Sequence, residues 1–375
     1  MKNFRFLDLF LSLSLFTSSC TAQPPAPASP SPVTPSPEMT PTVQSPTPSE
    51  SPKPRVIALK TIPEMQLPPG ISGESPAPEP ETRKLAWEYA GNTWTWEIKV
   101  ARALYLYYRG LPRPMTENYT VYVTHPLDDA LAGSMASELQ GVAQRENLSK
   151  LGAVELVIAM VQAIPYRLDV ATIGIEEYPR YPVELLVDGT GDCEDKAILL
   201  ASILIKLGYK VALVVFPDHG SLGIQAQEGM KGTSFPLNGV DYYYIEVTDS
   251  GWEIGELPDD LKRLGPHLFD MTPVPVVTQS MDASGVGTSL NVSLSIQNLG
   301  TAEAKDCYVL AGFDVGEGSL LNTQESSRFT LAPGEEESIK MYLQAPPGRY
   351  ARVVTRIISG GETLSESFSG WFNTP

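Results

Sequence analysis

Three residue types that together support thiol chemistry follow one another in the middle of the chain: Cys193, His219 and Glu246. A cysteine nucleophile must be ionised, accessible and placed beside a base that an acid orients. Asp192 stands at the N-cap of an apolar helix, so we expect Cys193 in the first helical turn, where the helix dipole and free backbone N–H groups stabilise a thiolate or an oxyanion. We predict a catalytic triad of Cys193, His219 and Glu246.

The choice of His219 follows from the local sequence. Negative charge at 192–195 raises the pKa of a thiol, so a cationic imidazole is needed beside Cys193. His125 precedes a proline in a turn and His267 follows a proline in a loop. His219 stands between two predicted strands, where a base can face the start of the helix.

Several alternatives stay open at this point. Asp241 and Asp249 lie at the ends of the strand that carries Glu246 and compete with it as the orienting acid. A cysteine before an apolar helix is also often a small buried residue, which would make the domain a non-catalytic binding or scaffold module. A metal site from Asp192, Cys193, Asp195 and His219 lacks the usual ligand spacing.

The elements that must position these residues indicate an α+β domain. Aromatic alternation from Trp87 to Trp96 predicts a hairpin that turns at 91–92 and whose tryptophans belong to the core. The hydrophobic pattern then predicts helices over 101–108, 126–145, 148–164 and 197–207, a long loop over 171–188, and strands over 211–216, 222–225 and 242–248. Runs of helices followed by runs of strands are typical of α+β domains.

After residue 272 the hydrophobic pattern changes from mixed helices and strands to short strands alone. About seven short strands, with turns at 333–334 and 347–348, predict an all-β sandwich over 273–375. Two cysteines, Cys193 and Cys307, fall in separate domains, so we expect no disulfide between them. Cys307 is expected to be a buried small residue.

The N-terminus predicts export. Lys2 and Arg5 precede a short apolar run over 7–16 that is too short to span a bilayer. The run ends in Thr-Ser-Ser-Cys at Cys20, which resembles the lipobox of bacterial lipoproteins and implies lipidation of Cys20. Cleavage near Ala22 is the alternative.

Residues 21–82 are dominated by proline, serine and threonine, so we predict a disordered linker. The apolar patch 56–59 is short, and we expect it to remain part of the linker rather than to dock on a folded domain. We therefore expect the chain to consist of a signal peptide (1–20), a linker (21–82), an α+β domain (83–272) and a sandwich (273–375).

Composition limits the partners. The 375 residues carry a formal net charge of −17, which argues against nucleic-acid binding because that affinity depends on phosphate neutralisation by lysine and arginine. No phosphate loop or dinucleotide fingerprint occurs, and no cofactor is implied. Calcium binding at the acidic surface stays open.

The segment around the cysteine resembles a known superfamily. Residues 191–197 read Gly-Asp-Cys-Glu-Asp-Lys-Ala, and with His219 and the strand around Glu246 they look like the active-site motifs of the transglutaminase-like superfamily. The resemblance covers roughly 83–258 and implies a papain-like core with thiol acyl transfer, as a peptidase, an amidase or a crosslinking enzyme. Two positions depart from the family pattern: Glu246 replaces its aspartate, and Gly220-Ser221 replaces the aromatic that follows its histidine.

The sandwich resembles Ig-like modules of the CARDB type. Asn298-x-Gly300 and the run Leu-Ala-Pro-Gly-Glu at 331–335 carry this likeness. The expected protein is thus an exported, lipid-anchored thiol enzyme that acts on peptide or protein substrates, such as cell-wall or surface proteins. The alternative is an inactive scaffold of the same fold, and the choice between water and an amine as acyl acceptor stays open.

Overall fold

The computed structural model describes residues 53–67, 71, 79–113 and 116–375 of the chain. The predicted signal peptide, Cys20 with its predicted lipid, Ala22 and most of the predicted linker lie outside the described residues. No described helix is long and apolar enough to cross a membrane.

A small three-stranded sheet opens the described chain. Strands β2 (Glu81–Tyr89) and β3 (Asn92–Val100) pair antiparallel, with Tyr89 opposite Asn92. The connecting Ala90 and Gly91 both have positive φ, 51° and 71°, as a two-residue hairpin turn requires. The turn therefore lies one residue earlier than predicted.

The predicted linker ends too late. Val56–Ala58 forms strand β1, which pairs parallel with β3, and Ile62 makes a further bridge to Ile98. Ile57, Leu59 and Ile62 are buried in the main core. The apolar side chains of this patch bury enough surface to order it, although its flanks are rich in proline.

Helices follow the hairpin. They are α1 (Arg102–Gly110), α2 (Thr120–Val123), the 3-10 helix η1 (Pro126–Asp128), α3 (Asp129–Arg145), α4 (Lys150–Gln162), α5 (Asp169–Thr172), α6 (Pro182–Asp188) and α7 (Cys193–Lys206). The three predicted helices within 101–164 and the apolar helix before residue 208 are thereby confirmed. The predicted loop over 171–188 is wrong at its end, because Pro182 at the first helical turn and a capping box to Glu184 start α6.

A five-stranded antiparallel sheet with the order β6-β7-β5-β4-β8 completes the α+β region. Its strands are β4 (Val211–Phe216), β5 (His219–Gln225), β6 (Ser234–Leu237), β7 (Val240–Ile245) and β8 (His267–Asp270). Strands β6 and β8 were not predicted, and His267 begins β8 rather than lying in a loop. A second 3-10 helix, η2 (Leu261–Arg263), precedes β8.

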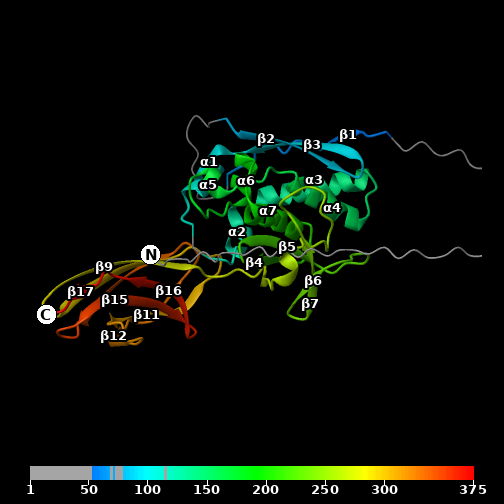
Figure 1. Ribbon diagram of the computed structural model, residues 1–375. Helices are drawn as coiled ribbons and strands as arrows, with labels where there is room; N and C mark the ends of the chain where they lie inside the picture. Colours follow the sequence, from blue (N-terminus) through cyan, green and yellow to red (C-terminus); the bar gives the residue numbers. More distant parts are fainter. Residues whose placement is uncertain (1–52, 68–70, 72–78, 114–115) are drawn as a thin grey trace, which may run out of the picture. The chain divides into compact units, whose positions relative to one another are not determined.

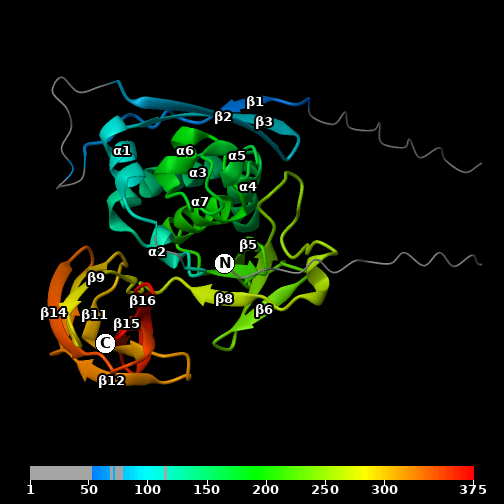
Figure 2. The same cartoon turned by 60° about the vertical axis from the view of Figure 1, so that its left-hand side comes forward.

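The helices lie between the two sheets, as Figures 1 and 2 show from two directions. Helix α7 packs against β4 and β5, and α4 packs against β2. The main core includes Trp87, Trp94 and Trp96, so the hairpin aromatics are core residues, as predicted. The chain is thus of mixed α+β architecture.

Two further antiparallel sheets make up residues 273–375, with the orders β14-β10-β9 and β12-β11-β15-β16. Their strands are β9 (Val277–Val286), β10 (Ser289–Asn298), β11 (Ala304–Asp314), β12 (Leu320–Glu325), β13 (Phe329–Leu331), β14 (Glu336–Gln344), β15 (Tyr350–Ser359), β16 (Glu362–Phe368) and β17 (Phe372–Asn373). Both sheets contribute to a second core that holds Cys307. The nine strands β9–β17 exceed the roughly seven that the sequence predicted.

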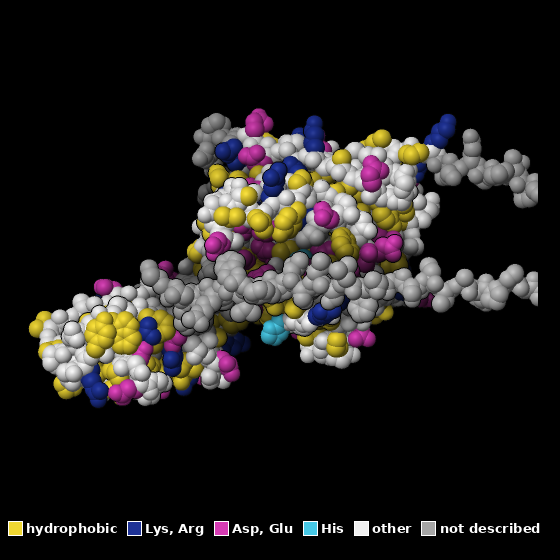
Figure 3. All heavy atoms as spheres, viewed as in Figure 1, with side chains coloured by type: hydrophobic (Ala, Val, Ile, Leu, Met, Phe, Trp, Pro, Cys, Tyr) yellow, Lys and Arg dark blue, Asp and Glu magenta, His cyan; other side chains and the backbone are white. Residues whose placement is uncertain are grey.

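The two cysteines of the described chain are both free and buried. The absence of a bridge between Cys193 and Cys307 agrees with the prediction. Acidic side chains lie along the middle of the α+β region on the face shown in Figure 3.

Candidate active site

Helix α7 begins at Cys193. Asp192 is its N-cap and forms a capping box with Asp195, whose Oδ2 accepts a hydrogen bond from the Asp192 N–H at 3.3 Å. The sequence predicted this placement of Asp192 and Cys193. Cys193 is the first residue of the helix and thus lies at the positive end of the helix dipole, and it is buried, at 8% exposure.

His219 lies on the neighbouring hairpin. It is the first residue of β5 and pairs with Phe216 at the end of β4. The two residues between them make a tight turn in which Asp218 has φ 60°. The ring nitrogen Nε2 lies 3.1 Å from Glu246 Oε2 and 3.1 Å from the Tyr244 hydroxyl. Nδ1 is therefore the ring nitrogen that remains for proton exchange.

Glu246 is the acid that holds His219, and neither Asp241 nor Asp249 has this contact. It follows the last residue of β7 instead of lying within the strand, and it is 1% exposed. Its Oε1 accepts hydrogen bonds from the Val247 N–H at 2.9 Å and from the Thr248 N–H and hydroxyl at 2.9 and 2.8 Å. Its Oε2 accepts from the Tyr244 hydroxyl at 2.6 Å.

These donors keep the carboxylate ionised. Burial by itself would raise the pKa of Glu246, but the hydrogen bond and charge of His219 and the hydrogen bonds from Tyr244 and Thr248 outweigh it and hold the pKa at about 2. Ionised Glu246 can orient the imidazole and stabilise its protonated form.

The thiol rests against a carboxylate. Cys193 Sγ lies 3.2 Å from Glu194 Oε2, to which it donates, and the Gly220 N–H donates to Sγ at 3.4 Å. Burial, followed by the charge of Glu194, raises the pKa of the thiol well above its usual range, and the Gly220 hydrogen bond only partly opposes this. The resting thiol is therefore protonated. Its hydrogen bond to the Gly220 N–H also holds it next to the residue that follows His219 in the chain.

Cys193 and His219 line the same cleft, which has a volume of about 1070 Å³. The turn 217–218, Tyr166 and Pro179 line it as well, and so does His267, which the sequence placed in a loop away from the site. Arg180, the residue after Pro179, is buried in the interior instead. Cys193 and His219 can therefore both be reached from this cleft.

Two carboxyl groups beside the sulfur carry unusual pKa values. Burial, together with the charge of Glu194, raises the pKa of Asp192 to about 9. Burial also raises the pKa of Glu194 to about 7. The Oδ1 atom of Asp192 is buried and has no hydrogen-bond partner among the described residues. Both acids therefore share a site that is short of positive charge.

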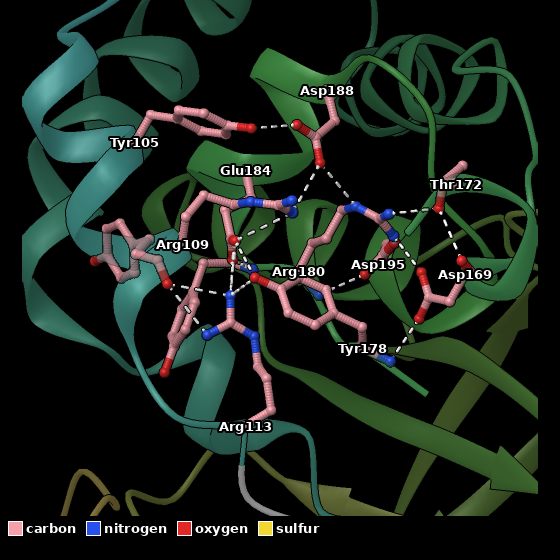
Figure 4. A network of polar contacts seen from close by, with 12 residues as sticks. Tyr105, Arg109, Arg113, Asp169, Thr172, Tyr178, Arg180, Glu184, Asp188 and Asp195 are labelled. Atoms are coloured by element: carbon pink, nitrogen blue, oxygen red, sulfur yellow. Dashed lines mark hydrogen bonds and ion pairs between the residues drawn. The ribbon is translucent and has the colours of Figure 1, made fainter. Parts of the chain in front are cut away.

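A buried arginine holds the start of α7 (Figure 4). The Arg180 backbone N–H donates to Asp195 Oδ1 at 2.6 Å, and Nη1 lies 2.5 Å from both Asp195 Oδ2 and Asp169 Oδ1. Nε reaches Asp188 Oδ2 at 3.0 Å. Because Asp195 also caps Asp192, Arg180 fixes the turn that carries Cys193.

A second set of contacts joins α7 to the segment that carries Glu246. The Lys196 ammonium donates to the carbonyl oxygens of Gln162, Ile164 and Thr248 at 2.8–3.0 Å. The Gln162 amide donates to the Glu246 carbonyl oxygen at 2.8 Å. Burial lowers the pKa of Lys196 to about 8. These contacts hold α7 and α4 against the segment that follows β7.

Four of these supporting residues were not assigned a role from the sequence: Tyr244, Lys196, Gln162 and Arg180. Tyr244 offered a signal, since it lies two residues before Glu246 and shares its face in an extended chain. The partners of Arg180, Lys196 and Gln162 are distant in sequence or are backbone atoms, so no spacing in the sequence indicates them. His125 belongs elsewhere: its Nδ1 contacts the Tyr108 hydroxyl at 2.8 Å.

A metal ion does not fit the acids at the helix start. Asp169, Asp192 and Asp195 bring carboxylate oxygens within 4.8 Å of one another. However, Arg180 Nη1 already lies 2.5 Å from two of them. The other set considered from the sequence, Asp192, Cys193, Asp195 and His219, does not form a cluster of metal-ligating atoms among the described residues; Asp192 and Asp195 cluster with Asp169 instead.

Comparisons with known proteins leave the family open. No protein-family model matches the chain, and no curated protein matches it. Among solved structures, the chain is similar to the CARDB domain of a Pyrococcus furiosus protein, with 14% identity over 26% of this chain and 94% of that domain, at a TM-score of 0.21.

Two other solved structures match with similar TM-scores and cover a similar share of this chain. The chain is similar to a beta-glucosidase from Kluyveromyces marxianus, with 12% identity over 27% of this chain and 15% of that one, at a TM-score of 0.18. It is also similar to beta-glucosidase 3B from Thermotoga neapolitana, with 16% identity over 26% and 16% of the two chains, at a TM-score of 0.19. The chain spans less than a fifth of either enzyme. Likenesses at these TM-scores assign neither a family nor an activity.

Proposed function

We propose that this chain is a thiol enzyme with a papain-like core of the transglutaminase-like type, which cleaves or transfers the acyl group of peptide or amide bonds. The observation that carries the proposal is the position of His219. Its Nε2 is held by ionised Glu246, while Nδ1 is left for a thiol that starts a helix on the same cleft. This is the order of base, acid and nucleophile that covalent acyl transfer needs.

In the proposed reaction, Cys193 leaves Glu194 and gives its Sγ proton to Nδ1 of His219. The sulfur attacks the substrate carbonyl carbon, and the backbone N–H of Cys193 helps to hold the oxyanion. His219 then gives the proton to the departing amine, which leaves a thioester on Cys193. Water or a second amine, deprotonated by His219, attacks the thioester and releases the acyl group.

Acylation of the full-length chain by a p-nitrophenyl ester tests this proposal. Intact-mass and peptide analysis should find a hydroxylamine-sensitive adduct on Cys193. The adduct should be absent from Cys193→Ala, retained in the Cys307→Ala control, and formed at least about tenfold more slowly in His219→Ala. Equal acylation of Cys193 with and without the imidazole would overturn it.

A non-catalytic binding module of the same fold is the second candidate. The contact between the thiol and Glu194 favours it, because burial and this carboxylate raise the pKa of Cys193. In that case Cys193 reacts slowly and without dependence on His219.

We further propose that the chain is exported and anchored through a lipid on Cys20, and that residues 273–375 are a CARDB-type, Ig-like sandwich that presents the site to a surface or wall partner. The apolar run 7–16 and the Thr-Ser-Ser-Cys motif support the anchor. Detergent phase partition tests it: the wild-type chain should enter the detergent phase and Cys20→Ser should not. Identical partition would contradict the anchor.

A further inference from the structure

The cleft around Cys193 is lined by many more acidic than basic side chains. The acidic residues, from rim to interior, are Glu117, Glu176, Glu177, Asp218, Asp192 and Glu194. Arg113 lines the cleft as well, but its Nη2 already lies 2.6 Å from Glu184, which therefore neutralises it. The cleft carries a net negative charge.

None of these six acids forms an ion pair with a described residue, whereas the acids just behind the cleft do. Asp169, Asp188 and Asp195 surround Arg180. The protein thus neutralises the carboxylates that face its interior and leaves those that face the cleft uncompensated. Glu117, Glu176, Glu177 and Asp218 are exposed and keep their charges in water, whereas burial raises the pKa of Asp192 and of Glu194 and favours their protonated forms. A ligand cation would be attracted by the exposed charges and would favour ionisation of the buried pair.

A second observation places the ligand charge near the sulfur. Asp192 is 6% exposed, lines the cleft, and has a buried Oδ1 without a hydrogen-bond partner among the described residues. Glu194, also at the inner end, touches the reacting Sγ at 3.2 Å. A cation held by this pair would lie beside the bond that Cys193 attacks. It would also draw Glu194 away from the thiol.

Apolar side chains flank the acids. Tyr166 and Leu168 line the same cleft and are 40% and 54% exposed. They can cover the aliphatic part of a long basic side chain, whose charged end then reaches the carboxylates.

We propose that the cleft selects acyl donors that carry a positive charge next to the reacting carbonyl, such as a peptide with a lysine-like or arginine-like side chain at that position. This inference rests on the proposed function of Cys193. An organic cation fits better than a metal ion, because Arg180 already occupies the carboxylate cluster behind Asp192.

Charged thiol reagents test the inference without requiring turnover. Cys193 of the full-length chain is treated at neutral pH and low salt with three methanethiosulfonates: the cationic trimethylammonium-ethyl, the neutral methyl and the anionic sulfonatoethyl compound. In each reaction the sulfur forms a mixed disulfide and methanesulfinate departs. Peptide mass analysis gives the rate at Cys193, and division by the rate of free 2-mercaptoethanol removes intrinsic reactivity.

We expect the normalised rate to be about tenfold higher for the cationic than for the anionic reagent, and to converge as salt screens the cleft. The variant Glu117→Gln/Glu176→Gln/Glu177→Gln should lose most of this preference. The matched control Glu325→Gln/Glu337→Gln/Glu362→Gln removes the same charge from exposed positions of the β-sandwich and should retain the preference.

Each outcome decides between the two proposals. Equal normalised rates, or a preference that the control variant loses to the same extent, would overturn the cationic substrate while leaving the triad intact. The His219→Ala variant separates the two proposals. If it keeps both the cleft-dependent preference for the cationic reagent and the wild-type rate of Cys193 modification, the result would support cation binding and contradict the proposed catalysis.

Discussion

At the scale of single residues, the transglutaminase-like motifs that the sequence resembles have an aspartate at the position of Glu246, whose side chain is longer by one methylene. Glu246 lies just beyond β7, and its extra methylene lets Oε2 reach His219 while Oε1 remains with the backbone N–H groups of Val247 and Thr248. Tyr244 fills the remaining space beside Oε2. The carboxylate is thus fixed from two sides before it meets the imidazole.

Truncation of the Glu246 side chain should slow acylation of Cys193 more than loss of its negative charge alone. We expect Glu246→Ala to lower the rate of Cys193 acylation by about 10²–10⁴-fold, because His219 loses its orientation. Glu246→Gln keeps an acceptor oxygen and should restore part of the rate. Stopped-flow acylation measures both, with circular dichroism as the control for folding. An unchanged rate in Glu246→Ala would exclude Glu246 from the triad.

Glu194 should act on the thiol in the opposite direction. Burial and the charge of Glu194 raise the pKa of Cys193, so Glu194→Gln removes the second cause and should lower the thiol pKa. The pH dependence of iodoacetamide alkylation should shift to lower pH in this variant. A shift to higher pH would mean that Glu194 assists ionisation instead of opposing it.

At the scale of elements, the start of α7 depends on Arg180. Its guanidinium holds Asp195 and Asp169, and both carboxylates would be buried without a counter-charge if it were removed. Lys196 and Gln162 then tie the same helix to the segment after β7. The site is therefore positioned by interactions between elements rather than by its own loops.

Arg180→Met should cost about 3–5 kcal/mol of unfolding free energy, because it leaves buried charges unpaired. The matched control Arg328→Met breaks the exposed pair with Asp306 and should cost about 0–1 kcal/mol. Urea denaturation of the two variants measures the difference. Equal losses would show that the Arg180 network does not support the fold.

The sequence indicated the elements whose signals are local. Helix α7 was predicted because its cap, Asp192, and its apolar face are contiguous, and β4 because every residue in it is apolar. Helix α6 was missed, since its surroundings are acidic and rich in proline and tyrosine. Strand β1 was undervalued for a related reason: its burial depends on pairing with β3, more than thirty residues away.

The sequence also indicated Cys193, His219 and Glu246 as one set, and in the structure Glu246 contacts His219 while His219 and Cys193 line the same cleft. The contacts of the Cys193 thiol could not be predicted from the sequence. Glu194 is the next residue in the chain, but whether its carboxylate points to the sulfur depends on the side-chain arrangement in the cleft. The ion pairs of Arg180 with Asp169, Asp188 and Asp195 join three different helices, and no local sequence pattern indicates them.

At the scale of the whole molecule, the acidic cleft should make stability depend on pH. The pKa of Asp192 is raised to about 9 and that of Glu194 to about 7, above the unfolded values near 4. Groups with a raised folded pKa contribute stability that is fully present below about pH 4 and is lost as pH rises through their folded values. Glu246 acts in reverse: its contribution is lost as pH falls from about 4 to 2.

The double variant Asp192→Asn/Glu194→Gln should therefore flatten the decline of unfolding free energy between about pH 5 and pH 9. Denaturant titrations at pH 5, 7 and 9 measure it against the wild-type chain. A decline of the same slope in both proteins would show that these two carboxyls do not titrate as the structure indicates.

The activated pair of Cys193 and His219 is tested most directly by the pH profile of Cys193 alkylation in the full-length chain, read from the Cys193 peptide. Burial and Glu194 raise the pKa of the thiol, so an inflection below the usual thiol value of about 8.5 must come from the imidazole. We predict such an inflection in the wild-type chain and its loss in His219→Ala. A slow, ordinary titration that is the same in both proteins would contradict a thiol catalytic site.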